Sequence, residues 1–387
     1  MARILYLSQG YCTHDRRFLE RLAEAGHEMW FVPCEAALVQ RHLAPAKSAV
    51  RWLPALSDCE VLPGTRAWAA AARRFQHVVR NVSPDLIHAG PIPTGGFFAA
   101  FAGFHPLLMM SWGSDVLSFP DEGPAARLIT EFALERANMA IADCEVVRER
   151  VAAFSGLPPK RIVCLPWGVD LTKFRPKTSA LGLRHRLGWN DCKVVIGTRS
   201  FEPIHGPLVF LDAMEKVLSE RDDVRVLMLG DGSLRRAVGW FIQGHDLFGK
   251  VHLAGQMPED ILPDYFAEAD LYVSATSCDG SSISLLQAMA CGLPAVVADR
   301  YGNKEWVTHG ENGWLYPAGD AEALAQTILQ ALEDDATRQL AGKANIQIAR
   351  ARADWDKNFT RVLTACDELL AGNGKREARN DAQFQNR

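Results

Sequence analysis

The sequence predicts an α/β protein with two parallel-sheet domains, and three observations carry that prediction. The chain has 387 residues, which exceeds one ordinary hydrophobic core and suits two domains. Short apolar segments of strand length alternate with longer amphipathic segments, which is the pattern of βαβ units. This alternation stops at a polar, turn-rich stretch and then starts again. We therefore expect each series to form its own open parallel sheet.

The first series begins with RILYL (3–7), DRRFLERLAEAG (15–26) and EMWFV (28–32), which form a strand, a helix and a strand. The other strands expected in this series are 85–88, 107–111, 139–142 and 161–165, with helices near 66–82, 125–137 and 145–154. One parallel sheet accounts for all of them.

The polar stretch LTKFRPKTSALG (171–182) marks the domain boundary. The strands expected after it are 193–198, 224–229, 251–255, 270–275, 294–299 and 313–317. The predicted organisation is an N-terminal domain 1–168, a linker 169–189, a C-terminal domain 190–350, a terminal helix 351–371 that packs back on the N-terminal domain, and a flexible tail 372–387.

Composition excludes several classes of protein. The chain is 48% hydrophobic and 23% charged with a formal net charge of -4, which disfavours disorder and nucleic-acid binding. Its nine cysteines are widely spaced and form no C-x-x-C pair, so neither a disulfide framework nor a zinc site is indicated. The opening MARILYLSQG has too short an apolar stretch for a signal peptide, so we expect a cytoplasmic location.

One stretch is long enough to cross a bilayer, because residues 89–114 carry no Asp, Glu, Lys or Arg. It is interrupted by the prolines at 91, 93 and 106 and by the glycines at 95, 96 and 103. These breakers predict a loop, a short buried helix (96–103) and a strand (107–111) in place of a membrane span.

Open parallel sheets bind ligands beyond the carboxyl ends of their strands, so we expect the chemistry in a cleft between two facing domains. The first loop, SQGYCTHD (8–15), lacks the G-x-G-x-x-G spacing of a dinucleotide site. Gly10 still allows the backbone to approach a ligand, and His14 and Asp15 start a predicted helix beside the cleft. The alternative for Asp15 is a helix N-cap.

The stretch TRSFEPIHG (198–206) places Arg199 and His205 at the end of the second domain's first strand. An arginine offers a fork of donors that fits phosphate oxygens, and a helix N-terminus adds partial positive charge. The alternative is a surface arginine and a loop histidine.

The most informative segment is SCDGSSISLLQAMACGLPAVVAD (277–299). A carboxylate, Asp279, ends a strand, and a glycine with three serines opens a helix whose free N–H groups suit a phosphate or sugar hydroxyls. Gln287 lies farther along that helix. A buried helix with serine caps is the alternative, but it leaves the DGSS sequence unexplained.

With these motifs in place, the chain resembles the family 4 glycosyltransferases of the GT-B fold over nearly its whole length. The matching segments are LAEAGHE (22–28), DLIHAG (85–90), SWGSD (111–115), LPWGVDLTKF (165–174), LGDGS (229–233), DGSSISLLQAMACGLP (279–294) and ENGWLYPAGDAEALA (311–325). Their order and spacing are those of the family.

The resemblance implies that Arg199 and His205 bind a donor diphosphate, with His205 where the family usually has lysine. A histidine there is expected to be only partly charged near neutral pH, which makes binding pH-dependent. The family's two glutamates, which contact the donor sugar and the ribose, correspond to Asp279 and Gln287, and Trp112 stands where many relatives carry histidine.

The resemblance thus implies a complete site. The catalytic candidates are Asp279, Arg199 and His205. The nucleotide-sugar candidates are Gly10, Gly232, Gln256, Ser282, Ile283, Ser284 and Gln287. The acceptor-side candidates are His14, Asp15, Trp112 and Asp115. No metal ligand and no cofactor belongs to the set.

The implied activity is a metal-independent hexosyl transfer, with retention, from a UDP- or GDP-linked sugar to a hydroxyl of a sugar, lipid-linked or small-molecule acceptor in glycan, glycolipid or metabolite biosynthesis. The altered site leaves two alternatives open, a non-catalytic partner with the GT-B fold and a nucleotide-sugar epimerase. The arginine-rich helix RAWAAAARRFQHVVRN (66–81) adds the expectation of peripheral contact with an anionic membrane, for which the alternative is a solvated helix of the first domain.

Overall fold

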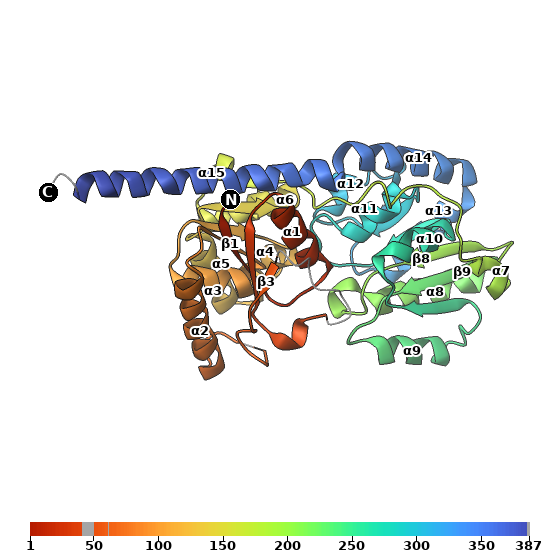
Figure 1. Ribbon diagram of the computed structural model, residues 1–387. Coiled ribbons are helices and arrows are strands. Elements are labelled where there is room, and N and C mark those ends of the chain that lie inside the picture. Colours follow the sequence, from red (N-terminus) through yellow and green to blue (C-terminus); the bar gives the residue numbers. More distant parts are fainter. Residues whose placement is uncertain (41–49, 61, 385–387) are drawn as a thin grey trace. The chain divides into compact units, whose positions relative to one another are not determined.

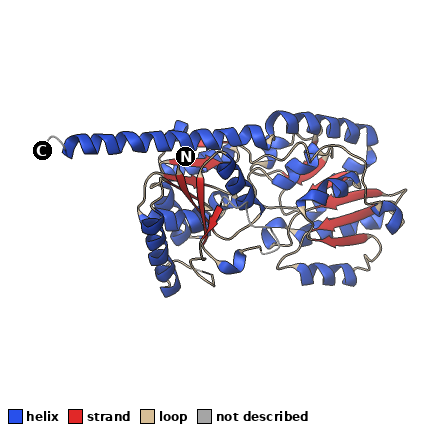
Figure 2. Cartoon of the chain, viewed as in Figure 1, coloured by secondary structure: helices blue, strands red, loops and turns tan. Residues whose placement is uncertain are grey.

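The computed structural model describes residues 1–40, 50–60 and 62–384, which form two compact units (Figures 1 and 2). Unit 1 comprises Met1–Leu165 and the chain from Phe359 onward, and unit 2 comprises Pro166–Asn358. Each unit has one sheet with helices around it. The chain therefore completes unit 2 before it returns to unit 1.

The sheet of unit 1 has seven strands in the order β3-β2-β1-β4-β5-β6-β7, and every neighbouring pair is parallel. The strands are β1 (Arg3–Ser8), β2 (Glu28–Pro33), β3 (Val50–Trp52), β4 (Leu86–Ala89), β5 (Leu107–Met110), β6 (Met139–Ala142) and β7 (Ile162–Cys164). The central strands are buried along their length, as in parallel sheets covered on both faces. The sequence did not predict β3, because two of its three residues are exposed and show no apolar pattern.

Helices connect these strands on both sides of the sheet, as βαβ crossovers require. They are α1 (Thr13–Glu24), α2 (Arg66–Val82), α3 (Phe97–Ala102), α4 (Ser114–Leu117), α5 (Pro124–Leu134) and α6 (Glu145–Ser155). A π-helical turn, η2 (Ile92–Gly96), leads from β4 into α3.

Unit 2 repeats this plan with six parallel strands in the order β10-β9-β8-β11-β12-β13. The strands are β8 (Lys193–Gly197), β9 (Val224–Leu229), β10 (Val251–Gly255), β11 (Leu271–Ser274), β12 (Ala295–Ala298) and β13 (Gly313–Tyr316). The helices are α7 (Leu183–Leu187), α8 (Pro207–Glu220), α9 (Arg235–Gly244), α10 (Leu262–Ala267), α11 (Ile283–Ala290), α12 (Asn303–Trp306), α13 (Ala321–Glu333) and α14 (Asp335–Arg352).

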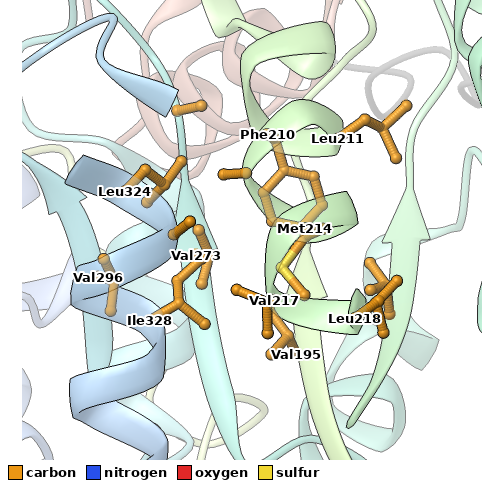
Figure 3. Close-up of a cluster of buried hydrophobic side chains, with 14 of the residues drawn as sticks. Val195, Phe210, Leu211, Met214, Val217, Leu218, Val273, Val296, Leu324 and Ile328 are labelled. Carbon is orange, nitrogen blue, oxygen red and sulfur yellow. The ribbon is translucent and has the colours of Figure 1, made fainter. Parts of the chain in front are cut away.

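The hydrophobic core of unit 2 lies where α8 and α13 pack beside each other on one face of the sheet (Figure 3). Phe210 and Met214 of α8, spaced four residues apart, point toward Leu324 and Ile328 of α13. This spacing places apolar side chains on one side of each helix. This packing fixes α8 against the sheet, and α8 begins after the loop that follows β8.

Both sheets reverse their strand order beside their first strand. In unit 1 the chain moves from β1 outward through β2 and β3 and then crosses to β4 on the other side of β1. In unit 2 the same crossing takes the chain to β11, which pairs with β8. Loops at such a switch point diverge above the carboxyl ends of the two strands and leave room for a ligand.

The charge-free stretch 89–114 folds within unit 1 as the end of β4, η2, α3 and β5. Among the residues that the structure describes, no helix is long and apolar enough to cross a membrane.

The last helix, α15 (Trp355–Phe384), belongs to unit 1 for most of its length. The Phe359 ring lies 5.4 Å from the Phe18 ring of α1, and the Arg21 guanidinium lies 5.8 Å from the Phe359 ring. The helix extends past residue 371, where the sequence analysis expected a tail. Lys, Arg, Glu, Ala and Gln in that part favour helix, although they provide no apolar pattern.

His88 lies in the middle of unit 1, on β4 beside Tyr6 of β1. It is 0% exposed, and neither of its ring nitrogens has a hydrogen-bond partner among the described residues. Its surroundings are aromatic, since the Tyr6 and Phe18 rings lie 5.0 and 5.8 Å away. Burial lowers the pKa of His88 to about 3, so the folded protein holds it neutral.

We predict that His88 makes unfolding sensitive to acid. In the unfolded chain, His88 binds a proton near the ordinary histidine pKa of about 6.5. The contribution of neutral His88 to the free energy of unfolding is therefore complete above that pH and is lost as the pH falls toward 3. Between pH 6.5 and 5 the loss amounts to about 2 kcal/mol. The substitution His88→Leu should reduce the fall in unfolding free energy between pH 7 and pH 5 by that amount, measured by denaturant titration.

The matched control is His77→Leu, which removes an exposed histidine of α2 and should leave the pH response unchanged. An equal loss of stability in the parent and in His88→Leu between these pH values would contradict the assignment.

Candidate functional site

A polar cluster lies at the switch point of unit 2. Arg199 follows β8, and Asp279, Ser282 and Ser284 follow β11, the strand that pairs with β8. The sequence predicted all four residues as site residues, and the structure brings their side chains into contact. They come from segments about 80 residues apart, which only the pairing of β8 with β11 makes neighbours.

The Arg199 guanidinium is at the centre of this cluster. Its Nη1 donates hydrogen bonds to Ser282 Oγ at 3.0 Å and to Ser284 Oγ at 3.1 Å. Its Nη2 lies 3.0 Å from His205 Nδ1 and 2.8 Å from Asp279 Oδ2. The Asp279 contact is an ion pair without the alignment of a good hydrogen bond. These contacts hold the planar group in one orientation.

Asp279 is the acidic member of the cluster, and its side chain is 18% exposed. Burial raises the pKa of this carboxyl, while the Arg199 charge and hydrogen bonds from the Ser282 side chain and the Gly280 backbone act in the opposite direction. The Arg199 charge and these donors thus offset part of the effect of burial on the pKa of the Asp279 carboxyl.

His205 contacts Arg199 through a defined tautomer. Arginine has donors only, so His205 Nδ1 must accept, and the ring proton is on Nε2. Burial and the Arg199 charge lower the pKa of His205 to about 3. The expectation of a partly charged His205 near neutral pH is therefore wrong for the ligand-free site. The ring offers a neutral N–H donor where the sequence analysis expected positive charge.

Close backbone contact keeps the loops around Arg199 tight. Gly206 has φ +60°, and a Cβ on it would lie 2.5 Å from the Ala275 carbonyl oxygen, so only glycine fits between the β8 and β11 loops. Glu202 accepts hydrogen bonds from the Ser233 backbone at 2.9 Å and from the Ser233 hydroxyl at 2.5 Å. Gly232, a predicted site residue, packs against this junction.

Helix α11 starts directly at the cluster. Ser282 is its N-cap residue and Ile283 its first residue, so its free backbone N–H groups lie beside Arg199. Gln287, one turn farther, is 6% exposed. Gln256 is exposed and directly follows β10. Strand β9 lies between β10 and β8, so Gln256 is at the carboxyl ends of the strands but outside the cluster.

Two further residues, which the sequence did not predict as site residues, support the site. Tyr272 is fully buried on β11 and donates a hydrogen bond to Ser284 Oγ at 3.1 Å. Glu202 joins the β8 and β9 loops. Tyr272 carries no signal of its own, because an aromatic residue in a buried strand is ordinary, whereas Glu202 stands in the quoted TRSFEPIHG segment.

At the switch point of unit 1, the structure brings two predicted acceptor-side residues together. The His14 ring, at the start of α1, lies 5.6 Å from the Trp112 ring after β5. Both side chains are partly exposed. Gly10 lies nearby in the β1–α1 loop, where a Cβ would be 2.3 Å from the Leu38 carbonyl oxygen.

The two acidic candidates of unit 1 are buried and hold loops. Asp15 is 0% exposed and accepts hydrogen bonds from the Cys12 backbone at 2.8 Å and from the Tyr6 hydroxyl at 3.3 Å. It closes a capping box from the third helical position, so Cys12, not Asp15, is the N-cap of α1. Burial raises the pKa of Asp15 to about 6.

Asp115 is likewise buried, with 6% exposure. It accepts hydrogen bonds from the Ser111 hydroxyl at 2.7 Å and from the backbones of Trp112 and Ile92, each at 2.9 Å. It therefore joins the loop after β5, which carries Trp112, to the loop after β4. Asp115 thereby holds in place the loop that carries Trp112.

The fold and site define an α/β protein of two nucleotide-binding-type units, with a phosphate-suited cluster in the second. Two family descriptions match this chain, "Glycosyl transferase 4-like domain" over residues 10–168 and "Glycosyl transferases group 1" over residues 192–334. The chain belongs to the family 4 glycosyltransferases of the GT-B fold, as the sequence analysis inferred.

Several curated proteins are similar to the chain. It is 26% identical over 258 residues to the D-inositol 3-phosphate glycosyltransferase of Thermobispora bispora, which covers 64% of this chain and 60% of that protein. It is 31% identical over 179 residues to the phosphatidyl-myo-inositol mannosyltransferase of Mycobacterium leprae, covering 45% of this chain and 46% of that protein. The chain thus spans less than two thirds of both relatives.

Solved structures agree in fold. The structure of HepE from Anabaena in complex with UDP has a TM-score of 0.75 at 21% identity, covering 95% of this chain and all of that one. Sucrose-phosphate synthase from Thermosynechococcus elongatus has a TM-score of 0.78 at 18% identity, covering 96% of this chain and all of that one.

Proposed function

We propose that this protein transfers a sugar from a nucleoside diphosphate sugar to an acceptor hydroxyl, with retention of the anomeric configuration. The observation that carries the proposal is the Arg199 guanidinium, held beside the N-terminus of α11 at the switch point of unit 2. A planar cation and free backbone N–H groups at one place are suited to the oxygens of a diphosphate.

The reaction needs positive charge where the leaving group forms. The bond between the anomeric carbon and the phosphate oxygen breaks, and the bond to the acceptor oxygen forms on the same face of the sugar. The leaving phosphate oxygen accepts the proton of the acceptor hydroxyl. Arg199 and the N-terminus of α11 stabilise the negative charge that develops on the diphosphate, which lowers the barrier.

His205 takes part as a neutral donor. Its Nε2–H completes the diphosphate site while its Nδ1 keeps Arg199 in place. Asp279 and Gln287 are assigned to the donor sugar and the ribose, since Asp279 lies on the segment that leads into α11 and Gln287 lies in that helix. His14 and Trp112 are the acceptor-side residues of unit 1.

The descriptions of two similar proteins support two kinds of donor. HepE is described in complex with UDP-glucose, and a similar mannosyltransferase of Corynebacterium glutamicum is described as GDP-mannose-dependent. We therefore assign a UDP- or GDP-linked hexose as donor. The acceptor is a sugar, a lipid-linked sugar or a small molecule of glycan biosynthesis, in line with similar proteins such as the putative teichuronic acid glycosyltransferase TuaC of Bacillus subtilis.

Two rival functions share the fold. A non-catalytic partner would bind nucleotide without turnover, and the departures at Asp279 and Gln287 from the usual glutamates are the observation that favours it. A nucleotide-sugar epimerase would need two carboxyl groups at the site, one to act as the acid and one as the base. The carboxylate that contacts Arg199 is Asp279. Release of UDP or GDP from its sugar by the purified protein supports transfer over both rivals.

We predict that Arg199→Ala weakens binding of the nucleoside diphosphate. The loss of hydrogen bonds from a charged donor should cost about 1.5 to 3 kcal/mol in binding free energy. The measurement is calorimetric titration of the parent and the variant with UDP and with GDP. Thermal unfolding of both proteins verifies that the variant is folded.

Arg186→Ala provides the control, because it removes the same charge from an exposed position on α7. Its affinity should equal that of the parent. If Arg199→Ala bound UDP and GDP as tightly as the parent, the donor site would not be at this cluster.

We also propose that turnover is independent of metal ions. Arg199 and the N-terminus of α11 supply the positive charge that a cation provides elsewhere. In the described part of the chain, no group of three or more His, Cys, Asp or Glu side chains is arranged to hold a metal ion. EDTA should therefore leave the rate of sugar transfer unchanged, whereas a complete loss that Mg²⁺ or Mn²⁺ restores would contradict the mechanism.

Peripheral membrane contact is the last part of the proposal, and α2 is its candidate surface. Arg66, Arg73 and Arg80 are exposed, whereas Phe75 is fully buried and Trp68 stacks on Phe98 at 5.5 Å. The aromatic side chains are thus used in packing, and any attraction must come from the arginines. Sedimentation with anionic vesicles should capture more protein than with neutral vesicles, and less at high salt; equal capture by both would exclude this surface.

A further inference from the structure

The Nη1 and Nη2 donors of Arg199 already face partners in the ligand-free protein. An arginine has five N–H donors. The two on Nη1 are directed at the two serine hydroxyls, and the two on Nη2 face His205 and Asp279. The remaining donor, Nε–H, is buried and has no partner among the described residues. A diphosphate can therefore reach this guanidinium only by displacing an acceptor.

The hydroxyl groups around Arg199 have a single consistent orientation. Ser284 Oγ accepts from Arg199 and from Tyr272, so its own proton is free only for Ser282 Oγ, 3.2 Å away. Ser282 Oγ then accepts from Arg199 and from Ser284, so its proton goes to Asp279. The protons thus run from Tyr272 through both serines to the carboxylate.

This chain of hydrogen bonds ends on an anion and stabilises the ionised form of Asp279. His205 is neutral, so one positive charge on Arg199 faces one negative charge on Asp279. A diphosphate brings at least two further negative charges to the same guanidinium. Both anions cannot keep close contact with Arg199, because like charges repel strongly at a site of low exposure.

We propose that Asp279 is an internal counter-anion, which occupies Arg199 in the ligand-free protein and gives up this place to the diphosphate of the donor. This inference rests on the proposed function and deepens it. Once the diphosphate has displaced it, the Asp279 carboxylate is free to accept hydrogen bonds from the donor sugar. One residue then couples diphosphate binding to sugar recognition.

The exchange leads to an unusual expectation for a residue of a binding site. Asp279→Asn removes the competing charge and keeps the size of the side chain, so it should bind UDP or GDP about fivefold to tenfold more tightly than the parent. The same variant should turn over the sugar donor more slowly, because the amide lacks the charge that acts on the sugar. Calorimetric titration and steady-state rates measure the two effects separately.

A second readout covers the stability of the variant. Without the Asp279 charge, the partly buried Arg199 charge is uncompensated, so the ligand-free variant should unfold at a lower temperature than the parent. Saturating UDP or GDP should raise its unfolding temperature by more than it raises that of the parent. This larger stabilisation by ligand remains measurable even when the variant is less stable.

The matched control is Asp222→Asn, which removes the same charge from a fully exposed position in the turn before β9. This turn lies at the amino ends of the strands, whereas Arg199 and Asp279 lie at their carboxyl ends. Its affinity for UDP or GDP should equal that of the parent. Equal tightening in both variants would show a general charge effect and overturn the proposal. So would weaker or unchanged binding by Asp279→Asn when the parent binds, which would leave the proposed function standing. Failure of the parent to bind any nucleoside diphosphate would overturn the proposed function together with this inference.

Discussion

The reversal of strand order beside β8 is the constraint on which the site depends. Parallel pairing of β8 with β11 brings together two loops that are about 80 residues apart in the chain. The next helices, α8 and α11, start at these loops and pack on the sheet, so the loops cannot drift apart. Arg199 and Asp279 can form an ion pair only because both strands end at this point.

Neutralisation inside the cluster determines its chemistry. In the ligand-free protein one carboxylate, two hydroxyls and one imidazole surround the guanidinium and face its Nη1 and Nη2 donors. Such a site avoids the cost of an unpaired buried charge, but it must exchange partners before it can bind an anion. Burial lowers the pKa of His205, and the Arg199 charge beside it acts in the same direction, since two adjacent positive charges repel each other.

The two units use buried carboxylates in different ways. In unit 1, Asp15 and Asp115 accept hydrogen bonds mainly from backbone N–H and hydroxyl groups and hold loops in place. In unit 2, Asp279 faces a side-chain cation. A carboxylate whose partners are fixed backbone donors is a structural element, whereas one that faces a cation can exchange its partner for a ligand.

The sequence by itself determined the alternation of strands and helices, the two sheets and the segments that carry Arg199, Asp279 and the serines, because apolar periodicity and glycine or serine at helix starts are local signals. It missed β3, the role of Tyr272 and the neutral state of His205, and it placed Asp15 at the wrong capping position. These depend on burial and on neighbours distant in the chain. Only the tertiary structure decided that Asp279 forms an ion pair with Arg199, because that contact results from strand pairing and not from residue spacing.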